Sequence, residues 1–310
     1  MCTLKKPKEK GPQNATVSFA NIGTPFHTFT MNKSFIMAGV IGWPVGHSRS
    51  PAIHNHWIHK YELHGTYGLF PVAPPDLETA IRGLKALGMA GCNITIPHKV
   101  SAMQYMDWID PLAKRMGAIN TIVVQPDGAL HGFNNDGFGY MQSLYEAQPK
   151  WRADAGPIAV LGAGGAARAI VVSLLDAGAK EIRILNRTRS KADALAKELG
   201  GIVTSHDWSD RHQALGGCNL LVNTTSLGMH GQEALDIHLD QLPRTALVSD
   251  AIYVPLETPL LENARQRGNT TVNGLGMLLH QARPAFHAWF GIMPEVTAEL
   301  QNTIITTINN

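Results

Sequence analysis

The hydrophobic positions from Phe35 onward alternate between short apolar runs and helical patterns. Apolar runs at residues 35–41, 68–72, 91–96 and 118–124 predict buried strands. Helical patterns lie between and after them, from Ser50-Pro51 to about Leu63, at 75–87 and at 99–116. Because strands that alternate with helices are typical of parallel sheets, we predict a parallel sheet for this part of the chain.

A second unit of the same kind begins after the polar stretch at 148–156. Its predicted strands are 157–161, 181–185, 220–222, 246–248 and 270–272, and its predicted helices are 168–177 and 190–199. The residues from Gly274 to the end have a helical pattern and need not pack on the unit just before them. We therefore predict an α/β chain of two domains. The first takes 34–135 and 274–310, the second takes 136–273, and 1–33 form a flexible tail.

Length and composition narrow the class of protein. A chain of 310 residues has room for two cores, and 44% hydrophobic with 16% charged residues is typical of a globular protein. We find no apolar run of about 18 residues that would span a bilayer. The net charge is +2, and 22 basic and 23 acidic residues follow residue 32, so we expect neither a membrane nor a nucleic-acid partner.

The cysteines and the first residues indicate the compartment. Cys2, Cys92 and Cys218 lack the spacing of metal or redox motifs, and we expect free thiols in a reducing cytoplasm. The first 30 residues have no continuous apolar segment and do not make a secretory signal. An organelle transit peptide is the weaker alternative to a flexible tail, because no Arg precedes Arg49.

A glycine-rich loop follows the strand at 157–161 and opens the next helix. Gly162, Ala163, Gly164, Gly165 and Ala166 match the dinucleotide fingerprint, whose small residues allow a tight turn and a close approach of the pyrophosphate to the backbone. The helix N-terminus then supplies amide donors for the phosphates. A simple tight turn is the alternative, but the strand before the loop and the helix after it favour cofactor binding.

The end of the next strand indicates which dinucleotide binds. NAD-binding units usually have an acidic residue there, whereas this chain has Asn186-Arg187-Thr188. The Arg187 guanidinium can pair with a 2′-phosphate, and Thr188 and Lys191 add a donor and a charge. The sequence therefore predicts NADP. The alternative is an ordinary solvated charge cluster at a helix entry.

Three polar clusters follow the predicted strands of the first unit. They are Gly46-His47-Ser48-Arg49-Ser50-Pro51, Asn93-Ile94-Thr95-Ile96-Pro97-His98-Lys99 and Asn134-Asn135-Asp136-Gly137. Ligands of open parallel sheets bind at the carboxyl ends of strands. Hydroxyls, amides, one Lys and one Asp suit a small polyhydroxylated anion, although each cluster alone could be a helix cap or a turn.

These motifs, taken in order, resemble the shikimate dehydrogenase family. The likeness rests on Pro44–Pro51, Asn93–Lys99, Gly117-Ala118-Ile119-Asn120-Thr121, the glycine loop, Asn186–Thr188, Asn223–Met229 and Gly274-Leu275-Gly276-Met277. It runs from about Ile36 to the C-terminus. The resemblance implies a substrate domain and a Rossmann domain that binds NADP, and reversible reduction of 3-dehydroshikimate to shikimate in the biosynthesis of aromatic amino acids.

The resemblance also implies roles for individual residues. Lys99 and Asp136 would be the catalytic pair, and Gly274 would lie at the cofactor. The substrate would be held by Ser48, Ser50, Thr95, Asn120, Tyr253 and Gln281. Chemistry agrees with the first of these roles, because hydride transfer to a ketone leaves an alkoxide and a positioned ammonium can protonate it.

Three positions depart from the family's usual residues. Asn135 stands where Thr is usual before the Asp, Phe133 where a smaller residue is common, and Asn273 where Asp is frequent. None of them removes a predicted catalytic residue, but Asn135 and Phe133 could change how the pocket orients its substrate. Ser50 favours shikimate over quinate, because family members that use quinate tend to have Thr there.

The sequence leaves other functions open. One is a quinate/shikimate dehydrogenase that uses both NAD and NADP, and another is a non-catalytic regulator that binds shikimate or NADP. His47, His54, His56, His59 and His64 suggest a metal site, but helical spacing would not bring three of them together, so we predict no metal. We expect a monomer or a homodimer.

Overall fold

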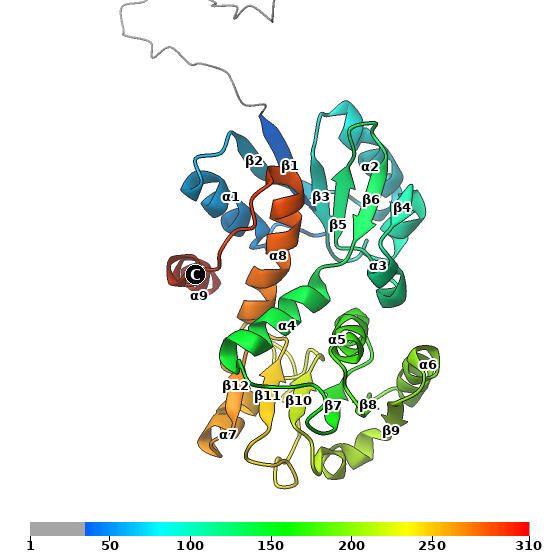
Figure 1. The fold of residues 1–310 in the computed structure, drawn as a ribbon, viewed down its shortest axis with the longest axis vertical. Coiled ribbons are helices and arrows are strands. Elements are labelled where there is room, and N and C mark those ends of the chain that lie inside the picture. The colour runs from blue at the N-terminus through cyan, green and yellow to red at the C-terminus, as the bar shows by residue number, and fades with distance from the viewer. Residues whose placement is uncertain (1–34, 310) are drawn as a thin grey trace, which may run out of the picture. The chain divides into compact units, whose positions relative to one another are not determined.

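Two six-stranded sheets organise the part of the chain that the structure describes. The computed structural model describes residues 35–309, and the predicted tail at 1–33 lies outside them. Phe35–Asn310 forms one compact unit. The first sheet contains β1 to β6 and the second contains β7 to β12 (Figure 1). The predicted α/β class is confirmed.

The first sheet is mixed. Its strands are β1 (Ile36–Gly42), β2 (Gly65–Pro71), β3 (Gly91–Ile94), β4 (Trp108–Ile109), β5 (Thr121–Val124) and β6 (Leu130–Phe133), in the order β2-β1-β3-β5-β6-β4. The strand β1 is parallel to β2 and β3, but β5 is antiparallel to both β3 and β6. The prediction of a wholly parallel sheet is therefore wrong for β5. The cause is that the chain reaches β5 at the carboxyl end of β3, where Ile94 N donates to Asn120 O at 2.9 Å, so β5 runs back along β3. A hairpin, in which Gln125 N donates to Ala129 O at 2.8 Å, then turns the chain into β6.

The helices of the first sheet are α1 (Ser50–Lys60), α2 (Leu77–Ala86) and α3 (Pro111–Met116). The predicted single helix at 99–116 is wrong, because this stretch contains a 3-10 turn at Ser101–Tyr105, then β4, then α3. Proline disfavours a helical residue before it, and Pro111 starts a new helix. Asp110 caps that helix by accepting from the amide of Leu112 at 2.9 Å.

The second sheet is entirely parallel. Its strands are β7 (Ile158–Leu161), β8 (Ile182–Leu185), β9 (Val203–His206), β10 (Leu220–Asn223), β11 (Leu247–Asp250) and β12 (Thr270–Val272). Their order is β12-β11-β10-β7-β8-β9, which is the doubly wound order of dinucleotide-binding sheets. The helices α5 (Gly165–Asp176), α6 (Arg189–Leu199) and α7 (Pro259–Gln266) belong to this sheet.

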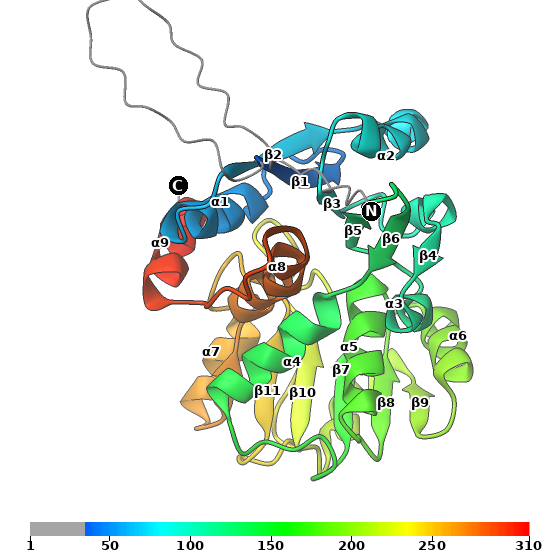
Figure 2. The ribbon, with the colours of Figure 1, turned by 45° about the horizontal axis from the view of Figure 1, so that its top comes forward.

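Two long helices connect the sheets. The helix α4 (Asp136–Ala147) leaves the first sheet after β6, and α8 (Gly274–Phe290) returns from the second after β12 (Figure 2). The last helix is α9 (Ala298–Asn309). Buried side chains of α8 and α9, such as Phe286 and Ile304, share a core with Ile53 and Trp57 of α1. The C-terminal helices thus pack with the first sheet, as their separate assignment in the sequence suggested, while the domain boundaries stay a prediction.

Within residues 35–309, no helix combines the length and the apolar character that a membrane crossing needs.

Candidate active site

A cavity of about 250 Å³ gathers most of the polar side chains that the sequence singled out. It is lined from the first sheet and its loops, from α4 and α8, and from the loop after β11. The predicted residues among its lining are Ser48, Ser50, Thr95, Lys99, Asn120, Asp136, Ala166, Tyr253, Gly274 and Gln281. Residues from six separate motifs therefore meet in one place.

Lys99 and Asp136 form an ion pair in this cavity. Lys99 Nζ donates to Asp136 Oδ2 at 2.6 Å, and the two side chains are 31% and 14% exposed. Lys99 lies in the loop after β3, where its carbonyl accepts from the amide of Ile119 at 2.9 Å. Asp136 is the first residue of α4, and its amide donates to Asn134 Oδ1 at 3.0 Å. Backbone hydrogen bonds of Lys99 and Asp136 thus fix the positions of both residues, and both side chains line the cavity.

Asn120 and Gln281 extend this pair. Asn120 Nδ2 donates to Asp136 Oδ1 at 2.9 Å and lies 3.4 Å from Gln281 Oε1. Asn120 comes from the segment just before β5 and Gln281 from α8. The cavity therefore presents one cation, one carboxylate and two amides within hydrogen-bond reach of one another.

Hydroxyl groups form another part of the lining. Ser48 and Ser50 lie at the start of α1, where the amide of Ser50 donates to Ser48 Oγ at 3.3 Å. Tyr253 comes from the loop after β11, and burial raises the pKa of its phenol, so the group stays a neutral donor at physiological pH. Arg49 opposes this shift in the pKa of Tyr253.

Three polar residues of the lining were not among the predicted site residues. They are His47, Arg49 and Asn93. His47 and Arg49 flank Ser48, and Asn93 is the first residue of the motif that ends in Lys99, so all three were within quoted motifs. Their sequence context alone does not show that β3 and the loop before α1 direct them to this cavity.

The glycine loop joins β7 to α5 with the geometry that a dinucleotide needs. Gly162 has a φ of +111°, and a Cβ there would lie 2.4 Å from Thr224 Oγ1, so only glycine fits. No side chain caps the N-terminus of α5, and a Cβ on Gly164 or Gly165 would have no heavy atom within 4 Å. The free amides and the open space fit a pyrophosphate.

The predicted 2′-phosphate residues follow the neighbouring strand. Gly162 N donates to Leu185 O at 2.7 Å, which brings the glycine loop beside the end of β8. There Arg187 is exposed and its Nη1 lies 3.5 Å from Glu233 Oε2, while Asn186 Nδ2 donates to Thr188 O at 2.8 Å. Thr188 and Lys191 are also exposed. These residues do not line the 250 Å³ cavity, which the glycine-loop helix reaches through Ala166.

One of the five clustered histidines has a clear packing role. His54 is fully buried in α1, and its ring stacks on Tyr67 with a centroid distance of 4.1 Å. Burial lowers its pKa to about 3, so the imidazole is neutral at physiological pH. Its ring also packs against Phe286 and Trp289 of α8, so His54 belongs to an aromatic core between α1 and α8.

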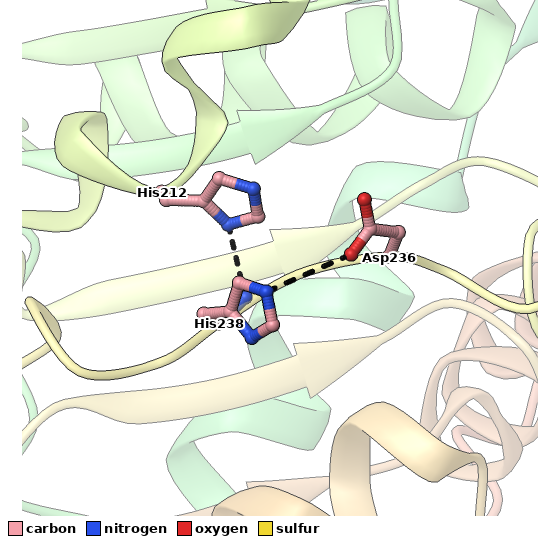
Figure 3. A group of neighbouring side chains, drawn as sticks. All are labelled: His212, Asp236 and His238. Atoms are coloured by element: carbon pink, nitrogen blue, oxygen red, sulfur yellow. Dashed lines mark hydrogen bonds and ion pairs between the residues drawn. The ribbon is translucent and has the colours of Figure 1, made fainter.

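A different group of side chains lies close enough to share a metal ion. His212, Asp236 and His238 offer atoms within 4.8 Å of one another (Figure 3). However, His212 Nδ1 accepts from the amide of His238 at 3.0 Å, and Arg211 donates to Asp236. A neutral imidazole that accepts at Nδ1 carries its proton on Nε2, which leaves no free lone pair for a metal. These bonds tie the loop before β11 to the turns after β9.

Models of three families match the chain. The match described as shikimate dehydrogenase substrate binding domain covers residues 40–122. The match described as shikimate / quinate 5-dehydrogenase covers residues 147–234, and that described as shikimate 5'-dehydrogenase C-terminal domain covers residues 274–298. The three matches follow one another along the chain in the order of the first sheet, the second sheet and α8.

Individual relatives are similar to this chain over 87–88% of its length. A shikimate dehydrogenase (NADP(+)) from Paramagnetospirillum magneticum is 53% identical over 87% of this chain and 98% of its own. A structure of shikimate 5-dehydrogenase from Thermus thermophilus in complex with NADP(H) and shikimate is 32% identical, with a TM-score of 0.76 over 88% of this chain and 98% of that one. A quinate dehydrogenase from Corynebacterium glutamicum in complex with NAD is 27% identical, with a TM-score of 0.81 over 88% and 100%. The chain therefore belongs to the shikimate dehydrogenase family.

Proposed function

We propose that this protein catalyses the reversible, NADP-dependent reduction of 3-dehydroshikimate to shikimate. The observation that carries the proposal is the ion pair of Lys99 and Asp136, with 2.6 Å between Nζ and Oδ2, in a cavity that Ala166 of the glycine-loop helix also lines. A proton donor thus lies next to the place where a dinucleotide fits. The family of the chain supports the same reaction.

Lys99, held by Asp136, would transfer the proton of the reaction. NADPH held at the glycine loop would supply the hydride to the ketone carbon. The Lys99 ammonium would give a proton to the ketone oxygen as negative charge develops on it, and in the reverse direction the neutral amine would take it back. Asp136 would hold the Lys99 side chain in place through the bond between Nζ and Oδ2.

The remaining polar lining suits a small polyhydroxylated carboxylate. Ser48 and Ser50 would bind the carboxylate together with Tyr253, while Thr95, Asn120 and Gln281 would bind ring hydroxyls. Hydroxyls and amides can donate and accept, which is what neighbouring hydroxyl groups require. Arg49, at the same edge of the cavity, would add positive potential for the carboxylate.

The cofactor would be held by two loops of the second sheet. Gly162, Ala163, Gly164, Gly165 and Ala166 would bind the pyrophosphate, and Gly274 would border the nicotinamide end. Arg187 would pair with the 2′-phosphate, assisted by Asn186, Thr188 and Lys191. Arg187 Nη1 lies 3.5 Å from Glu233 Oε2, and both side chains are exposed, so Glu233 would turn away when the 2′-phosphate takes its place.

The proposal extends to the compartment, the oligomeric state and the domain boundaries of the protein. We infer a cytoplasmic protein that works as a monomer or a homodimer in the synthesis of aromatic amino acids. We also infer a substrate domain of residues 34–135 and 274–310 and a cofactor domain of residues 136–273. Light scattering of the purified protein distinguishes the two oligomeric states.

The decisive experiment is a steady-state assay of NADPH formation with shikimate, for the wild type and for Lys99→Ala. We expect kcat to fall about 10²-fold to 10⁴-fold with a modest change in the KM for shikimate, because the proton transfer is made in the transition state. Lys197→Ala, on the exposed face of α6, is the matched control. An unchanged kcat with a raised KM would remove Lys99 from the chemistry.

The same assay separates the proposed reaction from its relatives. Quinate and NAD are tested beside shikimate and NADP, because the quinate dehydrogenase shares the fold. Arg187→Ala should raise the KM for NADP by about 10-fold to 150-fold and leave that for NAD unchanged, since a charged hydrogen bond contributes about 1.5–3 kcal/mol. Comparable efficiency with quinate and NAD in the wild type would favour the dual-specificity enzyme. Binding of NADP without any turnover would favour a regulator.

A further inference from the structure

A chain of buried hydrogen bonds leads from the core of the first sheet to Asp136. We propose that Thr121 is a positioning residue, whose hydroxyl sets the orientation of the Asn120 amide and, through it, of the Asp136 carboxylate. The proposal rests on the proposed function, because it explains how the acid–base pair is held. Thr121 and Asn120 are 1% and 2% exposed, so water does not replace a bond that is lost there.

The hydroxyl of Thr121 has only one place to send its proton. A threonine hydroxyl offers one donor and two acceptor sites. Thr121 Oγ1 accepts from Asn93 Nδ2 at 3.1 Å and from Asn135 Nδ2 at 3.0 Å. Both acceptor sites are therefore occupied, and the hydroxyl donates to Asn120 Oδ1 at 2.9 Å.

The orientation of the neighbouring amides is fixed independently. Asn93 Nδ2 faces the carbonyl of Asn120 at 3.0 Å, and a carbonyl can only accept, so the atom that faces it is the nitrogen. Asn93 Oδ1 in turn accepts from the Tyr67 hydroxyl at 2.6 Å. On the other side, the backbone amide of Asn135 donates to Asn120 Oδ1 at 3.0 Å, which identifies that atom as oxygen.

These bonds leave the Asn120 nitrogen facing the catalytic carboxylate. With Oδ1 of Asn120 held by two donors, Nδ2 donates to Asp136 Oδ1 at 2.9 Å. Lys99 takes the other carboxylate oxygen at 2.6 Å. Each oxygen of Asp136 thus has its own donor, which fixes the carboxylate and the ammonium that it holds. Thr121 acts on the reaction through Asn120, because it does not line the cavity.

The test is a comparison of Thr121→Val and Thr121→Ser. Valine keeps the shape but removes the hydroxyl, so Asn93 and Asn135 lose an acceptor and Asn120 loses a donor. We expect kcat of Thr121→Val to fall roughly tenfold at an unchanged KM for NADP, and Thr121→Ser to recover most of it. Asn135→Ala, which removes one of the two donors to Thr121, should give a smaller loss.

The matched control is Thr258→Val. Thr258 is equally buried at 1% exposed and donates to Asp250 Oδ2 at 2.8 Å, but it lies just before α7 and does not line the cavity. Its loss should lower stability and leave kcat per folded molecule unchanged. If Thr121→Val behaves in the same way, or if Thr121→Ser is as impaired as Thr121→Val, the positioning role is overturned.

A second readout is independent of activity. We expect the side-chain amide protons of Asn120, identified in ¹⁵N NMR spectra by their loss in Asn120→Asp, to exchange with solvent about tenfold faster in Thr121→Val. Thr121→Ser should restore slow exchange. If the wild type does not oxidise shikimate, the proposed reaction fails while this measurement still decides the positioning role. Equal exchange in all three proteins would contradict it.

Discussion

At the scale of single residues, His54 is a buried titratable group that the proposed reaction does not use. Its ring stacks on Tyr67 at 4.1 Å, and neither ring nitrogen has a hydrogen-bond partner among the described residues. Burial lowers its pKa from 6.5 to about 3. In the folded protein His54 is therefore neutral at mildly acidic pH, whereas in the unfolded chain its imidazole is protonated there.

This difference predicts how stability depends on pH. The contribution of His54 is fully present above pH 6.5, and it is lost as the pH falls from 6.5 towards 3, because the unfolded state then binds one more proton. Between pH 7 and pH 5 the loss should be about 2 kcal/mol. His54→Phe should remove that loss, and urea unfolding at the two pH values measures it.

The comparison of slopes separates titration from packing. A larger ring in the core can raise or lower the free energy of unfolding, but it does so equally at both pH values. His59→Phe, at an exposed position of the same helix, is the matched control. If the wild type and His54→Phe lose the same stability between pH 7 and pH 5, His54 does not carry this pH dependence.

At the scale of elements, the closest approach of α4 to α8 depends on Gly139. A Cβ there would lie 2.6 Å from the carbonyl oxygen of Met277 and 2.7 Å from the amide nitrogen of Gln281. Both are backbone atoms, so the helices would have to separate. Gly139→Ala should lower the free energy of unfolding by about 1–3 kcal/mol and raise the KM for shikimate, because Gln281 would move with α8.

A second glycine provides the control for that prediction. Gly83 lies inside α2, and a Cβ there would have no heavy atom within 4 Å. Gly83→Ala should therefore raise the free energy of unfolding by about 0.5–1 kcal/mol, because alanine is the better helix former. Thermal unfolding and shikimate kinetics of both variants test the pair. Equal effects of the two substitutions would show that the approach of α4 to α8 is not tight.

Some of the helices and strands could be predicted from the sequence pattern and others could not. The strands β7, β10 and β11 could be predicted because each contains a short apolar run, buried on both faces, between polar loops. The short strand β9 escaped prediction because Thr204, Ser205 and His206 give it no apolar run. The stretch at 99–116 was misread as one helix, although Pro111 marked a break, because its apolar spacing fits a helix as well.

In the candidate site, too, some features could be predicted from the sequence and others could not. The motif residues were predictable because polar side chains at strand ends lie at one edge of a sheet. The supporting bonds of Thr121 and Asn93 were not, because they depend on β3 and β5 being antiparallel neighbours, with Asn93 opposite Thr121. The return of the chain to the carboxyl end of β3, and the pairing of β5 with β3 that follows from it, are tertiary facts that no local pattern specifies.

At the scale of the whole molecule, packing and ion pairs both join the two sheets. Arg115 of α3, beside the first sheet, donates to both oxygens of Asp176 of α5 at 2.7 Å and 3.0 Å. Both side chains are nearly half exposed, so solvent screens their attraction. Close to this pair, a Cβ on Gly137 of α4 would lie 1.9 Å from Ser173 Oγ of α5 and 2.8 Å from Met116 Cε of α3.

We therefore expect buried packing, and not the ion pair, to hold this junction. A double-mutant cycle of Arg115→Ala and Asp176→Ala should give a coupling energy below about 1 kcal/mol. Gly137→Ala should lower the free energy of unfolding by about 2 kcal/mol or more, because it inserts an atom where α3, α4 and α5 meet. It should also lower kcat, since Asp136 is the residue before Gly137. Urea unfolding followed by tryptophan fluorescence, with and without added salt, measures all five proteins: the wild type, the two single variants, the double variant and Gly137→Ala. A coupling energy above about 2 kcal/mol, together with an unchanged stability of Gly137→Ala, would show that the ion pair holds the junction.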